Sequence, residues 1–116
     1  HDAGKPATTR TEADGRIGAP GHARAGALLA RRLLWEAGVA PDAREAVCGL
    51  VRWHMRPGFL VDAPDATRSS LTIAQSARCD HLALLAEADS RGRIASDTDA
   101  ALARMRFFAA FCAEMG

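Results

Sequence analysis

The side chains that could do chemistry in this chain are mainly imidazoles and carboxylates, and two of them open the sequence. Six residues have suitable types and positions: His1, Asp2, Lys5, His22, His54 and Asp89. Imidazole nitrogens and carboxylate oxygens are the ligands that hold catalytic divalent metals. The ammonium group of Lys5 suits a phosphate. The sequence therefore predicts chemistry at a metal centre.

Length and composition limit the kind of protein to which such a centre could belong. The chain has 116 residues, of which 48% are hydrophobic and 25% are charged, so it fits one globular domain with a modest core. Fifteen basic and fourteen acidic residues give a net charge of +1. This balance excludes a global basic field for nucleic acid, and any contact with RNA would be local.

Cysteine usage and hydropathy indicate the compartment. Cys48, Cys79 and Cys112 are odd in number and far apart, which gives neither a disulfide framework nor a CxxC metal motif. We interpret them as small apolar residues on helix faces in a reducing cytosol. The sequence has no signal-peptide pattern and no apolar run of about 18 residues. A cytoplasmic protein without membrane contact is expected.

The first part of the chain predicts a loop and two helices. Residues 7–20 lack periodicity and contain the turn signal Asp14-Gly15. A helix is expected over 21–37, with His22 in its first turn and Gly38 as its stop. Its apolar stripe is Ala27, Leu28, Ala30, Leu33, Leu34 and Ala37. A second helix should run from Pro41 to Pro57-Gly58. Its buried stripe is Ala43, Val47, Leu50, Val51, His54 and Met55.

The second part predicts three more helices after a Pro-rich loop over 59–64. Asp65 or Thr67 could cap a short helix that ends near Arg78, and Asp80 is the expected N-cap of the next helix. That helix has the inner stripe Leu82, Leu85, Ala86 and Asp89. A carboxylate there costs roughly several kcal/mol if it is buried without a partner, and a metal would be a sufficient partner. The last helix begins near Asp97, with the anchors Leu102, Met105, Phe108, Phe111, Cys112 and Met115. The predicted fold is all-α, with about five helices and no alternating strand pattern.

Each candidate residue also has a reading without function. A histidine at the end of an apolar helix face is more often a satisfied core residue than a ligand. An aspartate on an inner stripe is usually a cap or half of an ion pair. Lys5 could be solvated, and Arg91 and Arg93 could be ordinary charges at a helix C-terminus. The conjunction favours function, because three of the four histidines lie where helices end or face inward. His81 is expected to be exposed in a first turn.

Several short motifs resemble those of the HD superfamily of metal-dependent phosphohydrolases. The run His1-Asp2-Ala3-Gly4-Lys5 is similar to the HDxGK signature, and it is followed in the expected order by Gly21-His22, Trp53-His54 and Asp89. Residues 87–93 are similar to the EADxRGR-like stretch in the HD domain of bacterial tRNA nucleotidyltransferases. Related HD modules are fused to polynucleotide kinases of RNA repair. The resemblance covers residues 1–97 and implies an HD-type helical bundle over 1–116.

The resemblance also implies roles for the candidate residues. His1, Asp2 and Asp89 would hold a metal, and His22 and His54 would be further ligands in members with two ions. In members with one ion, these histidines would touch phosphate or shuttle a proton. Lys5, Arg91 and Arg93 would neutralise phosphate oxygens. The ion would be Mn, Mg, Ni, Co or Fe, one or two in number. It would lower the pKa of a bound water and so supply hydroxide.

The family's first metal-binding histidine lies upstream of the HD pair, so we expect a longer protein with an additional domain and weak metal binding by residues 1–116 alone. The implied substrate is a 2′,3′-cyclic phosphate or 2′-phosphate of a nucleotide or RNA 3′-end. The missing GYP tripeptide argues against the cyclic-dinucleotide branch. Two alternatives stay open. One is a catalytically silent helical module that positions RNA or a neighbouring domain, and the other is copper chelation by an N-terminal His1.

Overall fold

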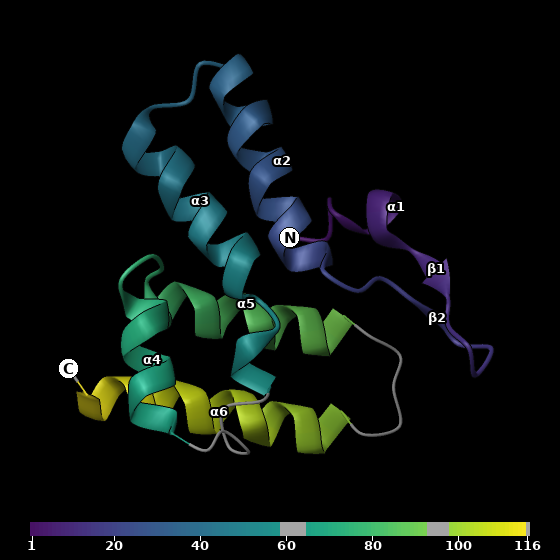
Figure 1. The fold of residues 1–116 in the computed structure, drawn as a ribbon. Coiled ribbons are helices and arrows are strands. Elements are labelled where there is room, and N and C mark those ends of the chain that lie inside the picture. Colours follow the sequence, from purple (N-terminus) through teal and green to yellow (C-terminus); the bar gives the residue numbers. More distant parts are fainter. Residues whose placement is uncertain (59–64, 93–97, 116) are drawn as a thin grey trace. The chain divides into compact units, whose positions relative to one another are not determined.

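The structure, a computed structural model, describes residues 1–58, 65–92 and 98–115. Its elements in these ranges are α1 (Lys5–Thr8), β1 (Arg10–Thr11), β2 (Ile17–Gly18), α2 (His22–Glu36), α3 (Pro41–Trp53), the 3-10 helix η1 (Arg56–Gly58), α4 (Ala66–Ala74), α5 (Cys79–Gly92) and α6 (Thr98–Met115) (Figure 1). The chain is therefore mostly helical, which confirms the predicted all-α class. It divides into two compact units, His1–Arg52 and Trp53–Gly116, which are described separately. The HD-type bundle over 1–116 stays a prediction.

The five predicted helices correspond to α2 through α6, and their ends agree with the sequence signals in most cases. Asp65 caps α4 as expected, because its Oδ1 accepts a hydrogen bond from the Arg68 backbone N–H at 3.0 Å. The N-cap assignment of Asp80 was wrong, since α5 already begins at Cys79. Asp80 lies inside the first turn, where its carboxylate pairs with Arg78 at 2.7 Å. Its negative charge also interacts favourably with the positive N-terminal end of the helix dipole. The loop predicted over 59–64 lies outside the described residues.

The segment predicted as a loop over 7–20 contains a small β-hairpin, which the sequence analysis missed. Its two strands pair in antiparallel register, with Arg10 opposite Gly18 and Thr11 opposite Ile17. The turn between them does follow the Asp14-Gly15 signal, because Gly15 has a φ of 86° and Asp14 Oδ1 accepts the Arg16 backbone N–H at 3.0 Å. Strands of two residues are too short to show the alternation on which strand prediction depends.

In the first unit, α2 and α3 form an antiparallel hairpin (Figure 1). Gly38 ends the first of these helices with a φ of 77°, a left-handed conformation that favours glycine. The pair Arg31–Glu45, at 2.9 Å, links the two helices on their exposed side. The hairpin therefore starts at His22 and returns along α3 to Trp53.

The buried faces of these two helices differ in part from the predicted stripes. On α2 the small residues Gly26 and Ala27 are buried, whereas Leu28 and Leu33 are 61% and 51% exposed. On α3 Cys48 is buried as well as Val51 of the predicted stripe, whereas Val47 is 40% exposed. The stripe prediction was wrong at these leucines and at Val47, because it favoured the largest apolar residues while the packing uses small ones that allow close approach.

In the second unit, α5 and α6 run antiparallel and side by side (Figure 1). Phe108 is fully buried, as predicted for the last helix, and Leu82 is fully buried on α5. Ile73 of α4 is also buried, and the indole N–H of Trp53 donates to Ser76 Oγ at 2.8 Å. This unit therefore has its own apolar core. The side chain of Met115 is not described.

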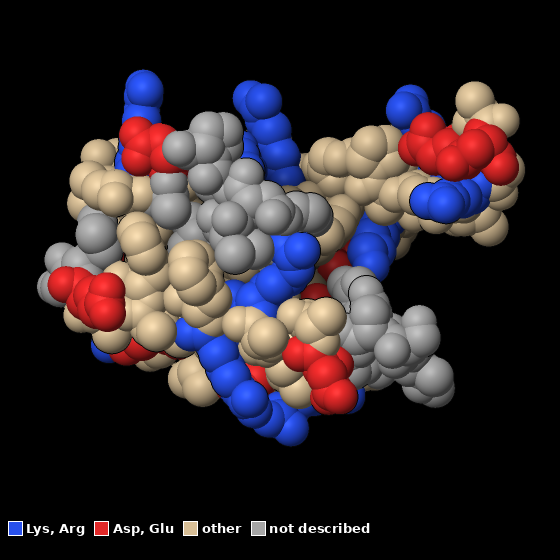
Figure 2. All heavy atoms as spheres, turned by 90° about the horizontal axis from the view of Figure 1, so that it is seen from below, with Lys and Arg blue, Asp and Glu red and all other residues tan. Residues whose placement is uncertain are grey.

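The surface agrees with the near-neutral net charge. On the face in Figure 2, basic and acidic side chains lie next to one another instead of forming one broad basic area. Several are paired in the structure, including Arg91 with Glu87 and Arg10 with Glu12. Among the described residues, no helix combines the length and apolar character needed to cross a bilayer. A general electrostatic platform for nucleic acid has no support on this face.

Candidate metal centre

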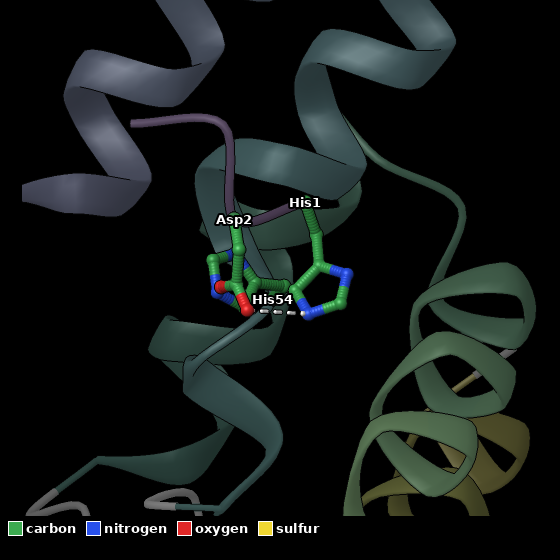
Figure 3. A group of neighbouring side chains, drawn as sticks. All are labelled: His1, Asp2 and His54. Atoms are coloured by element: carbon green, nitrogen blue, oxygen red, sulfur yellow. Dashed lines mark ion pairs between the residues drawn. The ribbon is translucent and has the colours of Figure 1, made fainter. Parts of the chain in front are cut away.

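Asp2 is the hub of a cluster of polar side chains in the first unit. Its Oδ2 lies 3.3 Å from His1 Nε2, an ion pair that Figure 3 draws. The same oxygen lies 3.3 Å from Lys5 Nζ, and Oδ1 lies 3.5 Å from His22 Nε2. Three residues that were singled out by type in the sequence therefore converge on the carboxylate of a fourth.

A hydrogen bond from Nδ1 determines which of the two His22 ring nitrogens carries the proton, and so leaves the other, which faces Asp2, with a free lone pair. His22 Nδ1 lies 3.0 Å from the Ala19 carbonyl oxygen, which can only accept, so Nδ1 carries a proton. In the neutral ring, Nε2 then presents its lone pair towards the carboxylate. A backbone carbonyl that fixes the tautomer in this way is typical of histidines that bind metals through the other nitrogen.

Gly21 gives His22 its place at the start of α2. Gly21 has a φ of 75°, in the left-handed region that glycine adopts without strain, so the chain can turn sharply just before the helix. The backbone N–H of His22 donates to the Ala19 carbonyl at 3.2 Å. The ring and the backbone of His22 thus use the same carbonyl. This double attachment restricts the ring to the side of the helix end where Asp2 lies.

Two glycines bring the N-terminal segment close enough for this contact. A methyl group on Gly4 would overlap the His22 carbonyl oxygen and would lie 2.6 Å from the Gly26 backbone nitrogen. A methyl group on Gly26 would lie 3.1 Å from Val51 Cγ1 and 3.2 Å from the Gly4 nitrogen. The backbones around Gly4 and Gly26 therefore touch directly. The sequence analysis used Gly4 only as part of a motif and did not assign this positioning role to either glycine.

Lys5 is held beside Asp2 by local structure. Its backbone N–H donates to the Asp2 carbonyl at 3.0 Å, which closes a turn at the start of α1. Pro6 suits this first turn because its fixed φ matches the helix and it needs no hydrogen-bond donor there. The Lys5 side chain is partly exposed, so the ammonium group can meet an anion from solvent while it stays near the carboxylate.

His54 belongs to the second unit and is described there by itself. It directly follows α3 and is 4% exposed, as its place on the predicted buried stripe indicated. Its role as a ligand stays a prediction.

The remaining candidate residues are less informative. Asp89 lies in the last third of α5, in the second unit, and is partly buried; its role as a ligand stays a prediction. Arg91 is exposed and pairs with Glu87 one turn earlier at 2.9 Å, as an ordinary helix-surface charge does. Arg93 lies outside the described residues. His81 is exposed in the first turn of α5, as expected.

The spacing of the donor atoms around Asp2 fits a cation better than direct hydrogen bonds. Two ligand atoms about 2.1 Å from one ion are about 3.0 Å apart in octahedral geometry and about 3.4 Å apart in tetrahedral geometry. The observed separations from the Asp2 oxygens are 3.3 Å to His1 and 3.5 Å to His22, longer than typical N–H···O⁻ bonds. The two histidines also approach different oxygens of the carboxylate. The arrangement therefore suits an ion at either oxygen.

No protein-family model, curated protein or solved structure matches this chain. The resemblance to the HD superfamily therefore stays a prediction from short motifs. The geometry of the cluster is independent of that resemblance.

Proposed function

We propose that this chain is a cytoplasmic metal-dependent phosphohydrolase. The observation that carries the proposal is the approach of His1 to one oxygen of Asp2 and of His22 to the other, each at a separation that suits a cation between the histidine and the carboxylate. The fixed tautomer of His22 supports it, since Nε2 is left to donate electrons. The motif resemblance adds His54 and Asp89 to the proposed ligand set, with one or two ions of Mn, Mg, Ni, Co or Fe.

Each residue of the cluster has a distinct part in this proposal. A divalent ion, when bound, supplies Lewis-acid activation of water and of a phosphoryl oxygen. Asp2 holds the ligands together and fixes their direction. Lys5 neutralises charge that develops on a nonbridging oxygen, because its ammonium group lies beside the carboxylate and is accessible to solvent. If one ion is bound, a histidine of the pair His22 and His54 that does not bind it binds the leaving group or gives it a proton.

The proposed substrate is the 2′,3′-cyclic phosphate or 2′-phosphate of a nucleotide or an RNA 3′-end. The motif resemblance alone supports this choice. The surface in Figure 2 has mixed charge, which favours a short terminal group over a long stretch of RNA. Contacts would then be limited to the phosphate and the terminal nucleoside.

The test compares wild type with Asp2→Asn, which keeps the side-chain size and removes the charge. Turnover of 2′,3′-cyclic AMP is followed by chromatography with Mn²⁺ or Ni²⁺, and Mn²⁺ binding is followed separately by electron paramagnetic resonance. We expect Asp2→Asn to lower turnover at least about 100-fold and to weaken Mn²⁺ binding. Asp42→Asn, an exposed carboxylate in the first turn of α3, is the matched control and should change neither quantity.

Equal turnover by wild type and Asp2→Asn would remove the hydrolase proposal. Binding of Mn²⁺ that depends on Asp2, without cleavage of any phosphoester, would favour the silent helical module instead. Equal Mn²⁺ binding by the two proteins would show that Asp2 is not a ligand.

A further inference from the structure

Two cysteines that are far apart in the sequence meet in the second unit. Cys79 is the first residue of α5, and Cys112 lies near the end of α6, so the antiparallel pairing of these helices brings both to the same end (Figure 1). Both line two cavities of about 460 Å³ and 650 Å³. Both are free thiols and only partly buried, so small molecules in solvent can reach them.

A buried hydroxyl from a third helix lines the larger cavity. Ser70 of α4 is 3% exposed, and its Oγ has no hydrogen-bond partner of ordinary geometry among the described residues. A buried hydroxyl without a partner costs free energy, so its retention indicates a polar group or ligand that it serves. Cys112 lines the same cavity, so its sulfur is the nearby polarisable group that this hydroxyl can serve.

The surroundings distinguish the two thiols. Burial, followed by the hydrogen bond and charge of Cys79, raises the pKa of the Cys112 thiol to about 12. Cys112 is therefore protonated at neutral pH and is a poor first nucleophile. Both side chains line the same two cavities, which brings the two thiols to one place in the unit. Such a pair suits a sequence in which Cys79 reacts first and Cys112 second.

We propose that Cys79 and Cys112 form a reversible thiol–disulfide site that exchanges with low-molecular-weight disulfides. The Cys79 thiolate attacks one sulfur of the small disulfide, which forms a mixed disulfide and releases one thiolate. Cys112 then loses its proton to solvent and attacks the Cys79 sulfur, which releases the second thiolate. The dithiol is oxidised to a disulfide and the small disulfide is reduced to two thiols. The cavity beside Cys79 holds the departing group.

This site is separate from the proposed metal centre and does not depend on it. The third cysteine, Cys48, is 2% exposed in the first unit, and burial raises the pKa of its thiol. It should therefore react slowly. The sequence analysis treated all three cysteines alike, because their spacing along the chain carries no sign of the pairing.

The test uses the chain of 116 residues, reduced and then incubated with oxidised glutathione at pH 8. After alkylation and digestion with trypsin without reduction, the three cysteines fall in three different peptides, 45–52, 79–91 and 107–116. We expect mass spectrometry to show peptide 79–91 linked to peptide 107–116. The linked species should be lighter by two hydrogen atoms than the summed masses of the two reduced peptides. In the folded protein this species should exceed any link to Cys48 at least about tenfold.

Denaturant provides an internal control. Cys79 is 31 residues from Cys48 and 33 residues from Cys112, so an unfolded chain closes the two loops with nearly equal ease. In concentrated urea the two links should therefore form in similar amounts. The proposal is overturned if the native protein gives the same mixture as the unfolded chain, or gives only glutathione adducts without the Cys79–Cys112 link.

The Ser70 hydroxyl is tested through the rate of the second step. Ser70→Ala should accumulate the glutathione adduct of Cys79 and slow its conversion several-fold, because the Cys112 thiolate loses a hydrogen-bond donor. The control is Ser69→Ala, because Ser69 lies next to Ser70 on α4 and is more exposed. This variant should form the Cys79–Cys112 disulfide at the wild-type rate. Equal closure rates for the two variants would overturn the part assigned to Ser70.

Discussion

Replacing Gly4 by alanine should damage the candidate metal centre although it replaces none of the proposed ligands. Gly4 has φ −78° and ψ −13°, which any residue can adopt, so the cost of the new methyl group is purely steric. That group would lie 2.6 Å from the Gly26 nitrogen and closer still to the His22 carbonyl oxygen, whereas ordinary contacts begin at 3.4 Å, so the segments must separate by at least about 0.8 Å. Overpacking of this kind costs about 1 to 3 kcal/mol.

The same movement exceeds what a metal site tolerates. Catalytic and metal-binding groups must stay within about 0.5 Å of their productive positions. Asp2 lies two residues before Gly4, and His22 lies on α2, the helix against which Gly4 packs. The separation of these two segments should therefore lengthen the contact between Asp2 and His22. We expect Mn²⁺ affinity to fall at least about tenfold in Gly4→Ala.

Two other glycines give a graded comparison. Gly18→Ala meets only the Glu12 side chain at 3.4 Å, an ordinary contact, and should behave as wild type. In Gly26→Ala the gain in helix propensity, about 1 kcal/mol, opposes the contact with Val51 at 3.1 Å, so stability should change little. Urea unfolding followed by circular dichroism and Mn²⁺ titration measure the series. The reasoning is refuted if Gly4→Ala and Gly18→Ala are indistinguishable in both assays.

Two further predictions concern stability. Phe108→Ala should lower the free energy of unfolding by about 3 to 5 kcal/mol, because the ring is fully buried, while Leu84→Ala, 65% exposed, should change it by less than about 0.5 kcal/mol in the same urea titration. The hydrogen bond from Arg31 holds the pKa of Glu45 below its usual 4.5, so this pair stabilises the fold above pH 4.5 and loses its effect as the pH falls through the lowered pKa. Glu45→Gln should therefore make the free energy of unfolding depend less steeply on pH between pH 5 and pH 3. The change should be small, because the pair is exposed. An unchanged slope in this range would contradict the stabilising role of the pair.

The helix boundaries that depend on local sequence signals were predicted well. Pro41 begins α3, Gly38 follows α2 and Asp65 caps α4, each as expected. These signals act through the backbone of the same few residues, so no knowledge of the rest of the fold is needed. The exact start of α5 was missed because Asp80 can satisfy first-turn N–H groups from inside the helix as well as from its cap.

The faces of the helices were harder to predict. Leu28 and Leu33 match helical spacing as well as Ala27 does, yet only Ala27 is buried. Periodicity shows that a helix has an apolar side but leaves its exact direction open by one residue. The direction is set by what packs against the helix, and here that is the glycine contact of Gly4 with Gly26.

For the candidate site, the sequence by itself determined the kinds of group present: two imidazoles, a carboxylate and an ammonium that could serve a cation and a phosphate. The chemical group of a side chain follows from its residue type and does not depend on the fold. Only the tertiary structure decided that His22, twenty residues away, faces Asp2, and that Cys112 lines the same cavities as Cys79. Those meetings depend on close backbone packing and on the antiparallel pairing of α5 with α6, because contacts between distant residues are fixed by the packing of whole elements and leave no mark on local spacing.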